Sequence, residues 1–211
     1  MRQIHYRNIG YPKTGTTWLY HQLNSHPDID GKISANYKEY NPYTKEKYMD
    51  FYKEFNVSFN LYTLLFTEPN KLYTATHITC TLRNLYELLN TWYNYLHYNP
   101  NFKMSVNDFL ETDSYNFKLI TNVGKIFSDW KNYDVKFLFY DDLQKDNQLY
   151  FHEICDYLNI KRYYDSRITP KFKTRITQQI LFEDANLIKY INEKICIIED
   201  HTKRDLSHWK K

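Results

Sequence analysis

The sequence has no long apolar segment that could act as a membrane anchor. No stretch approaches the roughly 18 consecutive apolar residues that a membrane-spanning helix requires. The first ten residues, MRQIHYRNIG, contain no apolar core of the length found in signal peptides. We therefore expect a protein with no membrane span and no cleaved leader.

Cysteine is also scarce, and its spacing carries no pattern. Cys80, Cys155 and Cys196 lie far apart and form neither a Cys-x-x-Cys pair nor a group with histidines at metal-ligand spacing. This distribution argues against a disulfide framework and against a zinc site. We interpret the cysteines as small buried side chains, and we expect a cytoplasmic protein.

The charge balance is mild and the chain is uninterrupted. Lys and Arg number 28 against 25 Asp and Glu, which gives a net charge of +3 over 211 residues. This excess is too small to indicate a nucleic-acid-binding surface. No repeat, low-complexity block or Pro/Gly/Ser linker divides the chain, so we expect a single domain over residues 1–211 and no nucleic-acid partner.

Of only four glycines, two form the most informative feature of the sequence. Gly10 and Gly15 lie five residues apart in IGYPKTGTTWL, the glycine spacing of the phosphate-binding loop G-x-x-x-x-G-K-[ST]. However, Thr16 stands where that loop has its lysine, and the only lysine present, Lys13, precedes the second glycine. A short strand at 2–9 is expected before the loop, and a helix after it that ends at HPDIDG.

The remaining pattern alternates strands with helices. We expect strands at 32–37, 74–82 and 135–140, helices at 44–55, 85–96 and 117–130, and a capped helix start at Ser105. This alternation predicts an α/β fold, a three-layer sandwich whose mostly parallel central sheet is covered by helices on both faces.

The loop suggests its own chemistry. In parallel α/β sheets ligands gather where a strand ends and a helix begins, because the helix offers free N–H donors and a positive dipole. Gly15 would let the backbone approach an anion, and the neighbouring threonines would add hydroxyl donors. A lysine ahead of the glycine suits a donor that transfers a sulfuryl group and whose leaving group is a phosphate oxygen. Such a transfer requires no metal.

These residues carry a family resemblance. YPKTGTTWL resembles the 5′-phosphosulfate-binding loop of the sulfotransferases, which use 3′-phosphoadenosine-5′-phosphosulfate (PAPS) and leave 3′-phosphoadenosine 5′-phosphate (PAP); LNSHPDI, VKFLFYDDL and DLSHW resemble later parts of the family. The resemblance implies a P-loop-like sulfotransferase fold and sulfuryl transfer without a metal. It also implies that the 5′-phosphosulfate is bound by Lys13, Thr14, Gly15, Thr16 and Thr17, with Lys13 stabilising the leaving oxygen.

A second stretch resembles the family's 3′-phosphate site. In LRNLYELLNTWYNY, Arg83 ends an expected strand and Thr91 lies eight residues on, where the family usually has serine; Leu85 replaces the usual proline. A guanidinium makes paired hydrogen bonds to phosphate and a hydroxyl adds one. The alternatives are a solvated or salt-bridged Arg83, and a Thr91 hydroxyl bonded back along its own helix.

The base that takes the acceptor's proton is suggested by resemblance too. NYKEYNPYTKEKYMDFYKEF resembles the glycan-modifying branch, which implies Glu39 as the base, Lys38 as a helper near the donor and Tyr40 as an acceptor contact. The acceptor is then a small molecule or glycan, with a carbohydrate hydroxyl or amine expected. Glu46 and Glu54 are interpreted as parts of a solvated helix face.

Several other polar residues are interpreted as structural. His26, His77 and His97 are expected at a helix terminus, in mid-strand and at a helix end. Asp141 and Asp142 are expected to cap a helix beginning near Asp146 rather than to bind a metal. The basic run KFKTR at 171–175, with Lys173 and Arg175, is the only counterpart of the glycine-containing basic loop of the cytosolic sulfotransferases.

Two rival functions share the same loop. A nucleotide-dependent kinase would need a lysine at position 16 and a carboxylate for magnesium. A non-catalytic relative would keep the nucleotide pocket without turnover. The missing lysine places the kinase well behind the sulfotransferase.

Overall fold

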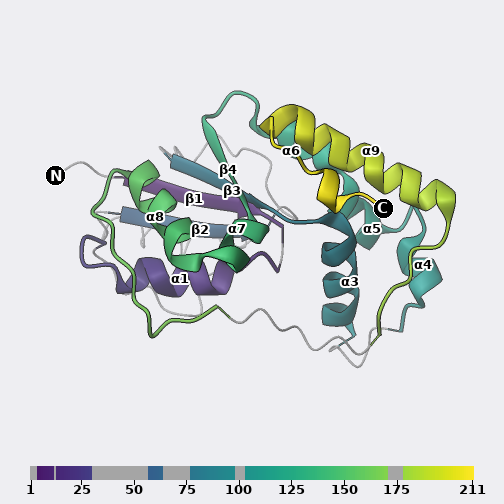
Figure 1. Cartoon of the computed structure of the whole chain (residues 1–211), viewed down its shortest axis with the longest axis horizontal. Coiled ribbons are helices and arrows are strands. Elements are labelled where there is room, and N and C mark those ends of the chain that lie inside the picture. The colour runs from purple at the N-terminus through teal and green to yellow at the C-terminus, as the bar shows by residue number, and fades with distance from the viewer. Residues whose placement is uncertain (1–3, 12, 30–56, 64–76, 98–102, 171–177) are drawn as a thin grey trace, which may run out of the picture. The chain divides into compact units, whose positions relative to one another are not determined.

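The structure, a computed structural model, describes residues 4–11, 13–29, 57–63, 77–97, 103–170 and 178–211. These residues form two compact units (Figure 1). The sheet unit comprises Met1–Leu82 and Asn132–Phe172, and the helical unit comprises Arg83–Lys131 and Lys173–Lys211. Each unit is described by itself, and the single domain expected over 1–211 stays a prediction.

The sheet unit is built on parallel strands. These are β1 (Ile4–Gly10), β2 (Val57–Thr63), β3 (His77–Leu82) and β4 (Val135–Phe139), in the order β2-β1-β3-β4. Every pairing is parallel, with Asn8 opposite Thr79 and Gly10 opposite Thr81. The carboxyl ends of the strands therefore share one edge, and the glycine-containing loop leaves the sheet there.

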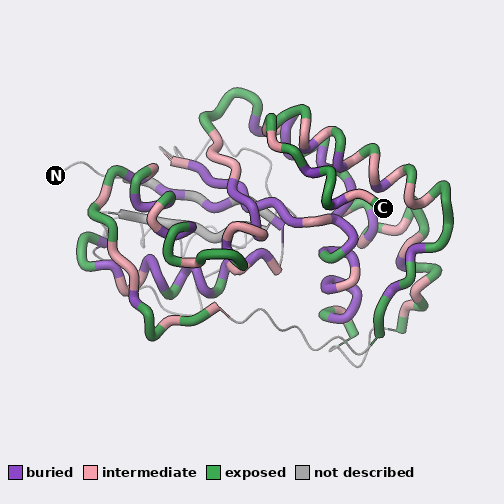
Figure 2. The backbone as a smooth tube through the Cα atoms, viewed as in Figure 1, coloured by how far each residue is buried: buried purple, intermediate pink, exposed green. Residues whose placement is uncertain are grey.

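Helices pack on this sheet through one apolar cluster. They are α1 (Thr16–Ser25), α7 (Tyr140–Lys145) and α8 (Asn147–Leu158). Along α1, buried positions are interrupted by exposed ones, as expected of a helix with one face in a core (Figure 2). The Trp18 ring meets Phe151 edge to face at 6.1 Å, and both side chains are buried. Their burial fixes α1, and with it the loop at its N-terminus.

The chain after α8 is hydrogen-bonded to side chains of α1. The buried Gln22 amide donates to the carbonyls of Asp165 and Ile168 at 2.9 and 3.0 Å and accepts from the Asp165 N–H at 3.1 Å. Trp18 Nε1 also donates to the Ile168 carbonyl, at 2.9 Å. The side chains of α1 thus satisfy the backbone of a segment without regular structure.

The helical unit contains α3 (Leu85–Leu96), α4 (Val106–Leu110), α5 (Tyr115–Thr121), α6 (Val123–Trp130), α9 (Ala185–Thr202) and the 3₁₀ turn η4 (Ser207–Trp209). The long α9 contacts α3 and α6 and buries Ile191, Ile195 and Ile198 at helical spacing. Within the described ranges, no helix combines the length and apolarity needed to cross a membrane.

Most sequence predictions of single elements are confirmed. β1, β3, β4, α1 and α3 lie where they were expected, and Ser105 caps α4 by accepting the Asp108 N–H at 3.1 Å. The helix predicted at 117–130 is wrong as one element, because the non-helical ψ of 54° at Asn122 separates α5 from α6. The strand expected at 32–37 and the helix at 44–55 lie outside the described residues.

Candidate functional site

The loop between β1 and α1 turns through two left-handed residues. Lys13 has φ 63° and Gly15 has φ 85° and ψ 14°. Glycine adopts this conformation freely, whereas a lysine does so at a cost in strain. A non-glycine residue in this region is held there by its surroundings, which marks the loop as a candidate site.

Internal hydrogen bonds define the shape of the loop. The buried Thr14 hydroxyl donates to the Tyr11 carbonyl at 2.7 Å, and the Tyr11 N–H donates to the Thr81 carbonyl of β3 at 3.4 Å. Thr14 therefore closes the loop on itself through its side chain, a role that the sequence did not predict. Its hydroxyl hydrogen is engaged there, which leaves its backbone N–H as the donor for an anion.

Gly15 is required for a second reason. A Cβ atom at this position would lie 2.5 Å from Leu143 Cδ2 and 4.0 Å from Tyr140 Cε2. Leu143 belongs to α7 and is buried, so it has little room to withdraw. Sequence reasoning missed Leu143 as a site residue, although it stands in the YDDL turn that carried part of the resemblance.

The N-terminus of α1 faces the loop without a side-chain cap. The first helical bond is donated by Leu19 N–H to the Gly15 carbonyl at 3.0 Å, so the N–H groups of Thr16, Thr17 and Trp18 precede the hydrogen-bonded ladder. The first turn contains no acidic residue. Backbone donors and the positive end of the helix dipole make this terminus suited to an anion.

A buried polar network ties the sheet together beneath the loop. The Tyr6 hydroxyl donates to Thr79 Oγ1 at 2.6 Å, which donates to Asn8 Oδ1 at 3.1 Å. The hydroxyls of Thr81 and Tyr150 lie 2.9 Å apart. Burial raises the pKa of Tyr6 and of Tyr150 far above the ordinary value of a phenol, so both hydroxyls remain protonated. The network links β1, β3 and α8.

In the helical unit, Arg83 lies two residues before the start of α3. Asn84 caps this helix by accepting the Tyr86 N–H at 3.0 Å, and the buried Leu85 is its first residue. The Arg83 side chain is 9% exposed, and its Nη2 lies 3.3 Å from Glu87 Oε2. The salt-bridged state weighed from the sequence is therefore the one observed.

Thr91 lies on α3, eight residues after Arg83, and is buried. Thr121 and Thr202 donate their hydroxyls to the carbonyls of Phe117 and Ile198, each four residues earlier, at 2.9 and 2.8 Å. The Thr91 hydroxyl makes no such bond with any residue that the structure describes. The alternative of a hydroxyl bonded back along its own helix is thus wrong for Thr91.

The histidines take structural places. His26 Nδ1 accepts the Asp28 N–H at 3.1 Å, so Nε2 carries the proton and donates to the Lys161 carbonyl at 2.7 Å. His77 begins β3 rather than lying mid-strand, with its ring 5.2 Å from that of Tyr157. His97 ends α3, as expected.

The paired aspartates do not cap the helix expected of them. Asp141 and Asp142 lie in the first turn of α7, and it is Asp146 that caps α8 by accepting the Leu149 N–H at 2.9 Å. The sequence prediction did not include α7, which the extended backbone of Asp146 separates from α8. No group of three potential metal-ligating side chains occurs among the described residues.

The remaining candidates cannot be placed. Glu39, Lys38 and Tyr40 lie outside the described residues, as do Lys173 and Arg175.

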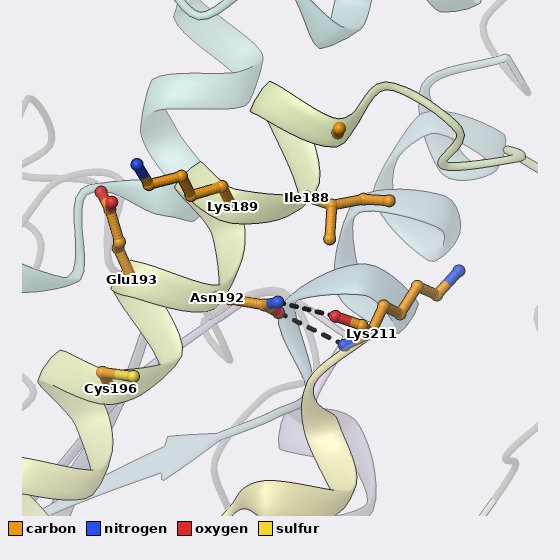
Figure 3. Close-up of a pocket in the computed structure, with 7 residues that line it drawn as sticks. Ile188, Lys189, Asn192, Glu193, Cys196 and Lys211 are labelled. Carbon is orange, nitrogen blue, oxygen red and sulfur yellow. Dashed lines mark hydrogen bonds between the residues drawn. The ribbon is translucent and has the colours of Figure 1, made fainter.

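A pocket of about 640 Å³ lies along α9 and includes none of the predicted site residues (Figure 3). At its edge Asn192 donates to the Lys211 carbonyl at 2.8 Å and accepts the Lys211 N–H at 3.3 Å.

Comparisons with known proteins bear on this site. A family model described as "Sulfotransferase domain" matches residues 8–184. The search of curated proteins gives no match. Among solved structures, a sulfotransferase from Alicyclobacillus acidocaldarius is similar with a TM-score of 0.65 and 14% identity, covering 100% of both chains.

Two further structures are similar. Mouse sulfotransferase SULT7A1 complexed with PAP has a TM-score of 0.52 and 19% identity, over 92% of this chain and 65% of the mouse chain. The sulfotransferase domain from the curacin biosynthetic pathway has a TM-score of 0.50 and 12% identity, over 98% of this chain and 99% of that one. At these identities the likeness shows the fold.

Proposed function

This chain belongs to the sulfotransferase family, and we propose that it transfers the sulfuryl group of PAPS to a hydroxyl or amine of a carbohydrate. The observation that carries the proposal is the loop of residues 10–17, in which Lys13 precedes a left-handed Gly15 at the uncapped N-terminus of α1. This combination offers donors to an anion without the lysine position that kinases use.

The loop fits the 5′-phosphosulfate of the donor. Gly15 has no room for a Cβ, so the loop backbone packs closely against Leu143 of α7. We propose that the first N–H groups of α1, with the hydroxyls of Thr16 and Thr17, bind the phosphosulfate oxygens. The Lys13 ammonium then stabilises the negative charge that develops on the departing phosphate oxygen.

We propose that Arg83 and Thr91 bind the 3′-phosphate of the same nucleotide. Arg83 supplies a charged fork of N–H donors, and the Thr91 hydroxyl, which is not engaged by its own helix, supplies one more. The PAP bound to the mouse structure is a nucleotide with such a phosphate. The likeness to that structure supports the donor and leaves the acceptor to experiment.

We propose Glu39 as the base. As the acceptor oxygen or nitrogen bonds to sulfur and the bond from sulfur to the phosphate oxygen breaks, the acceptor proton passes to Glu39. Lys38 is proposed to lie near the donor, and Tyr40 to contact the acceptor. Support for these roles comes from the sequence NYKEYNPY and its likeness to the glycan-modifying branch.

A matched pair of variants tests this function. We expect Glu39→Gln to abolish transfer of labelled sulfate from PAPS to a panel of glycan acceptors while PAP binding is unchanged. Glu46→Gln, which removes the same charge seven residues later, should transfer at the rate of the parent protein. Full activity in Glu39→Gln, or a parent protein that binds PAP without turnover on any acceptor, would contradict the proposal.

A further inference from the structure

The guanidinium that we assign to the 3′-phosphate is already held by a carboxylate. Glu87 Oε2 accepts hydrogen bonds from Arg83 Nε at 3.4 Å and from Nη2 at 3.3 Å. Nε and Nη2 form one edge of the guanidinium, the kind of edge through which arginine grips carboxylates and phosphates. The Glu87 oxygen therefore lies where one oxygen of a phosphate would bind.

The two side chains differ in exposure. The Arg83 side chain is 9% exposed, whereas that of Glu87 is 52% exposed. A cation so far removed from water needs a partner at all times. Glu87 can supply that partner and still has solvent into which to withdraw.

The geometry of the pair is that of a weak contact. Both distances are at the long end for hydrogen bonds, and both run to a single carboxylate oxygen rather than to two in parallel. An ion pair whose carboxylate is half exposed to water contributes little to stability. A doubly charged phosphate in the same place would hold the arginine more strongly.

We propose that Glu87 and the nucleotide 3′-phosphate exchange on Arg83: Glu87 holds the guanidinium in the ligand-free protein, yields to the phosphate when the nucleotide binds, and returns as the spent nucleotide leaves. This inference rests on the proposed function, because it needs Arg83 to bind the 3′-phosphate. It adds a positioning residue, Glu87, that competes with the product for the same N–H groups.

The sign of the effect follows from the charges. A carboxylate near a phosphate dianion repels it, and that repulsion exceeds the small benefit of holding Arg83 in place beforehand. Neutralising Glu87 should therefore tighten nucleotide binding. Because turnover requires the spent nucleotide to leave, tighter binding should slow release and lower kcat together with KM.

The test compares nucleotides with and without a 3′-phosphate. Binding of PAP and of 5′-AMP is measured by calorimetry for the parent protein, Glu87→Gln and Arg83→Lys. We expect Glu87→Gln to bind PAP about threefold to tenfold more tightly, since an exposed charge near a phosphate acts through a partly screened interaction, and to bind 5′-AMP as the parent does. Steady-state kinetics should show kcat and KM for PAPS falling together.

Two control variants separate the effect of the Glu87 charge on nucleotide binding from a loss of folding. Glu193→Gln on α9 changes the net charge equally and involves a residue with no ion pair to Arg83 among the described contacts, so it should leave PAP binding unchanged. Glu87→Asp, with the carboxylate one methylene shorter, should bind PAP with an affinity between those of the parent and Glu87→Gln. This second variant also serves if Glu87→Gln folds poorly.

Two outcomes would overturn the exchange in different ways. If the parent binds PAP more tightly than 5′-AMP, and Arg83→Lys removes that preference, but Glu87→Gln binds PAP no more tightly, the exchange is wrong while the 3′-phosphate site stands. If the parent does not distinguish PAP from 5′-AMP, the assignment of Arg83 is wrong and the exchange falls with it.

Discussion

Leu143 of α7 lies directly against Gly15, the residue that precedes α1, so closely that a Cβ on the glycine would come within 2.5 Å of Leu143 Cδ2. This contact joins α7, which follows β4, to the loop that follows β1. It sets the position of the loop, and the left-handed φ of Gly15 sets its direction.

Gly15→Ala should therefore damage both stability and nucleotide binding. The methyl group meets a buried leucine and the residue must keep φ near 85°, which together should cost about 1–3 kcal/mol of unfolding free energy. Chemical denaturation measures the loss, and calorimetry should find no PAP binding.

Gly124→Ala is the matched control. Gly124 lies in α6, and a Cβ there meets no atom within 4 Å. Alanine favours helix over glycine, so this variant should be more stable by about 0.5–1 kcal/mol and should bind PAP normally. Equal effects of the two substitutions would refute the importance of the Gly15 contact.

The Thr14 hydroxyl gives a prediction within the loop. Thr14→Val keeps the shape of the side chain but removes the donor to the Tyr11 carbonyl, which should cost about 1–2 kcal/mol of stability and weaken PAP binding. Thr14→Ser keeps the hydroxyl and should behave like the parent. Thermal melts with and without PAP distinguish the variants; identical behaviour of valine and serine would show that the bond is unimportant.

Thr91 and Thr121 provide a pair with opposite expectations. Thr91→Val should weaken PAP binding and leave stability nearly unchanged, because the Thr91 hydroxyl has no bond to lose among the described contacts. Thr121→Val should lose about 1 kcal/mol of stability with its bond to Phe117, and should bind PAP as before. The reverse pattern would exclude Thr91 from the 3′-phosphate site.

Stability in acid should depend on Asp165. Its carboxylate accepts hydrogen bonds from Arg167 Nε and Nη2 at 2.8 and 2.7 Å, which lower its pKa from 3.8 to about 2. Because the folded pKa lies below the unfolded one, this carboxylate stabilises the fold at pH values above 3.8 and its contribution is lost as the pH falls toward about 2.

Urea unfolding between pH 2 and 6 measures this dependence. The difference in unfolding free energy between the parent and Asp165→Asn should be constant above about pH 5 and should shrink as the pH falls toward about 2. The difference between the parent and Arg167→Gln should shrink over the same pH interval, because Arg167 is exposed and its main role is this ion pair. A difference that persists unchanged at pH 2 would contradict the prediction.

How far the sequence predicted the structure depended on whether the signal was local. The loop that leads through Gly15 into α1 and the cap at Ser105 come from residues adjacent in sequence, and both were predicted. β2 was missed although Val57, Phe59 and Leu61 alternate with polar residues, and α9 was missed although its isoleucines recur at helical spacing. In these two elements the pattern was present and had not been interpreted.

The contacts that shape the site join residues far apart in the chain, so no local sequence pattern indicated them. Leu143 is 128 positions from Gly15, and the bond from Thr79 to Asn8 joins strands 71 residues apart. Such pairs arise from the order β2-β1-β3-β4, which the sequence does not specify. Arg83 and Glu87 are four residues apart, but Arg83 precedes the cap residue Asn84 and lies outside α3, so the helical i,i+4 rule did not predict their pairing.

The proposed function depends most on Lys13, which precedes the glycine of an anion-binding loop and is proposed to serve a phosphosulfate rather than a triphosphate. A thermal-shift titration of the parent protein with PAP in the presence of EDTA, set beside ADP and ATP with magnesium, tests this directly. We predict a concentration-dependent rise in Tm with PAP alone and little change with the others. Stabilisation by ATP with magnesium, and none by PAP, would contradict the account.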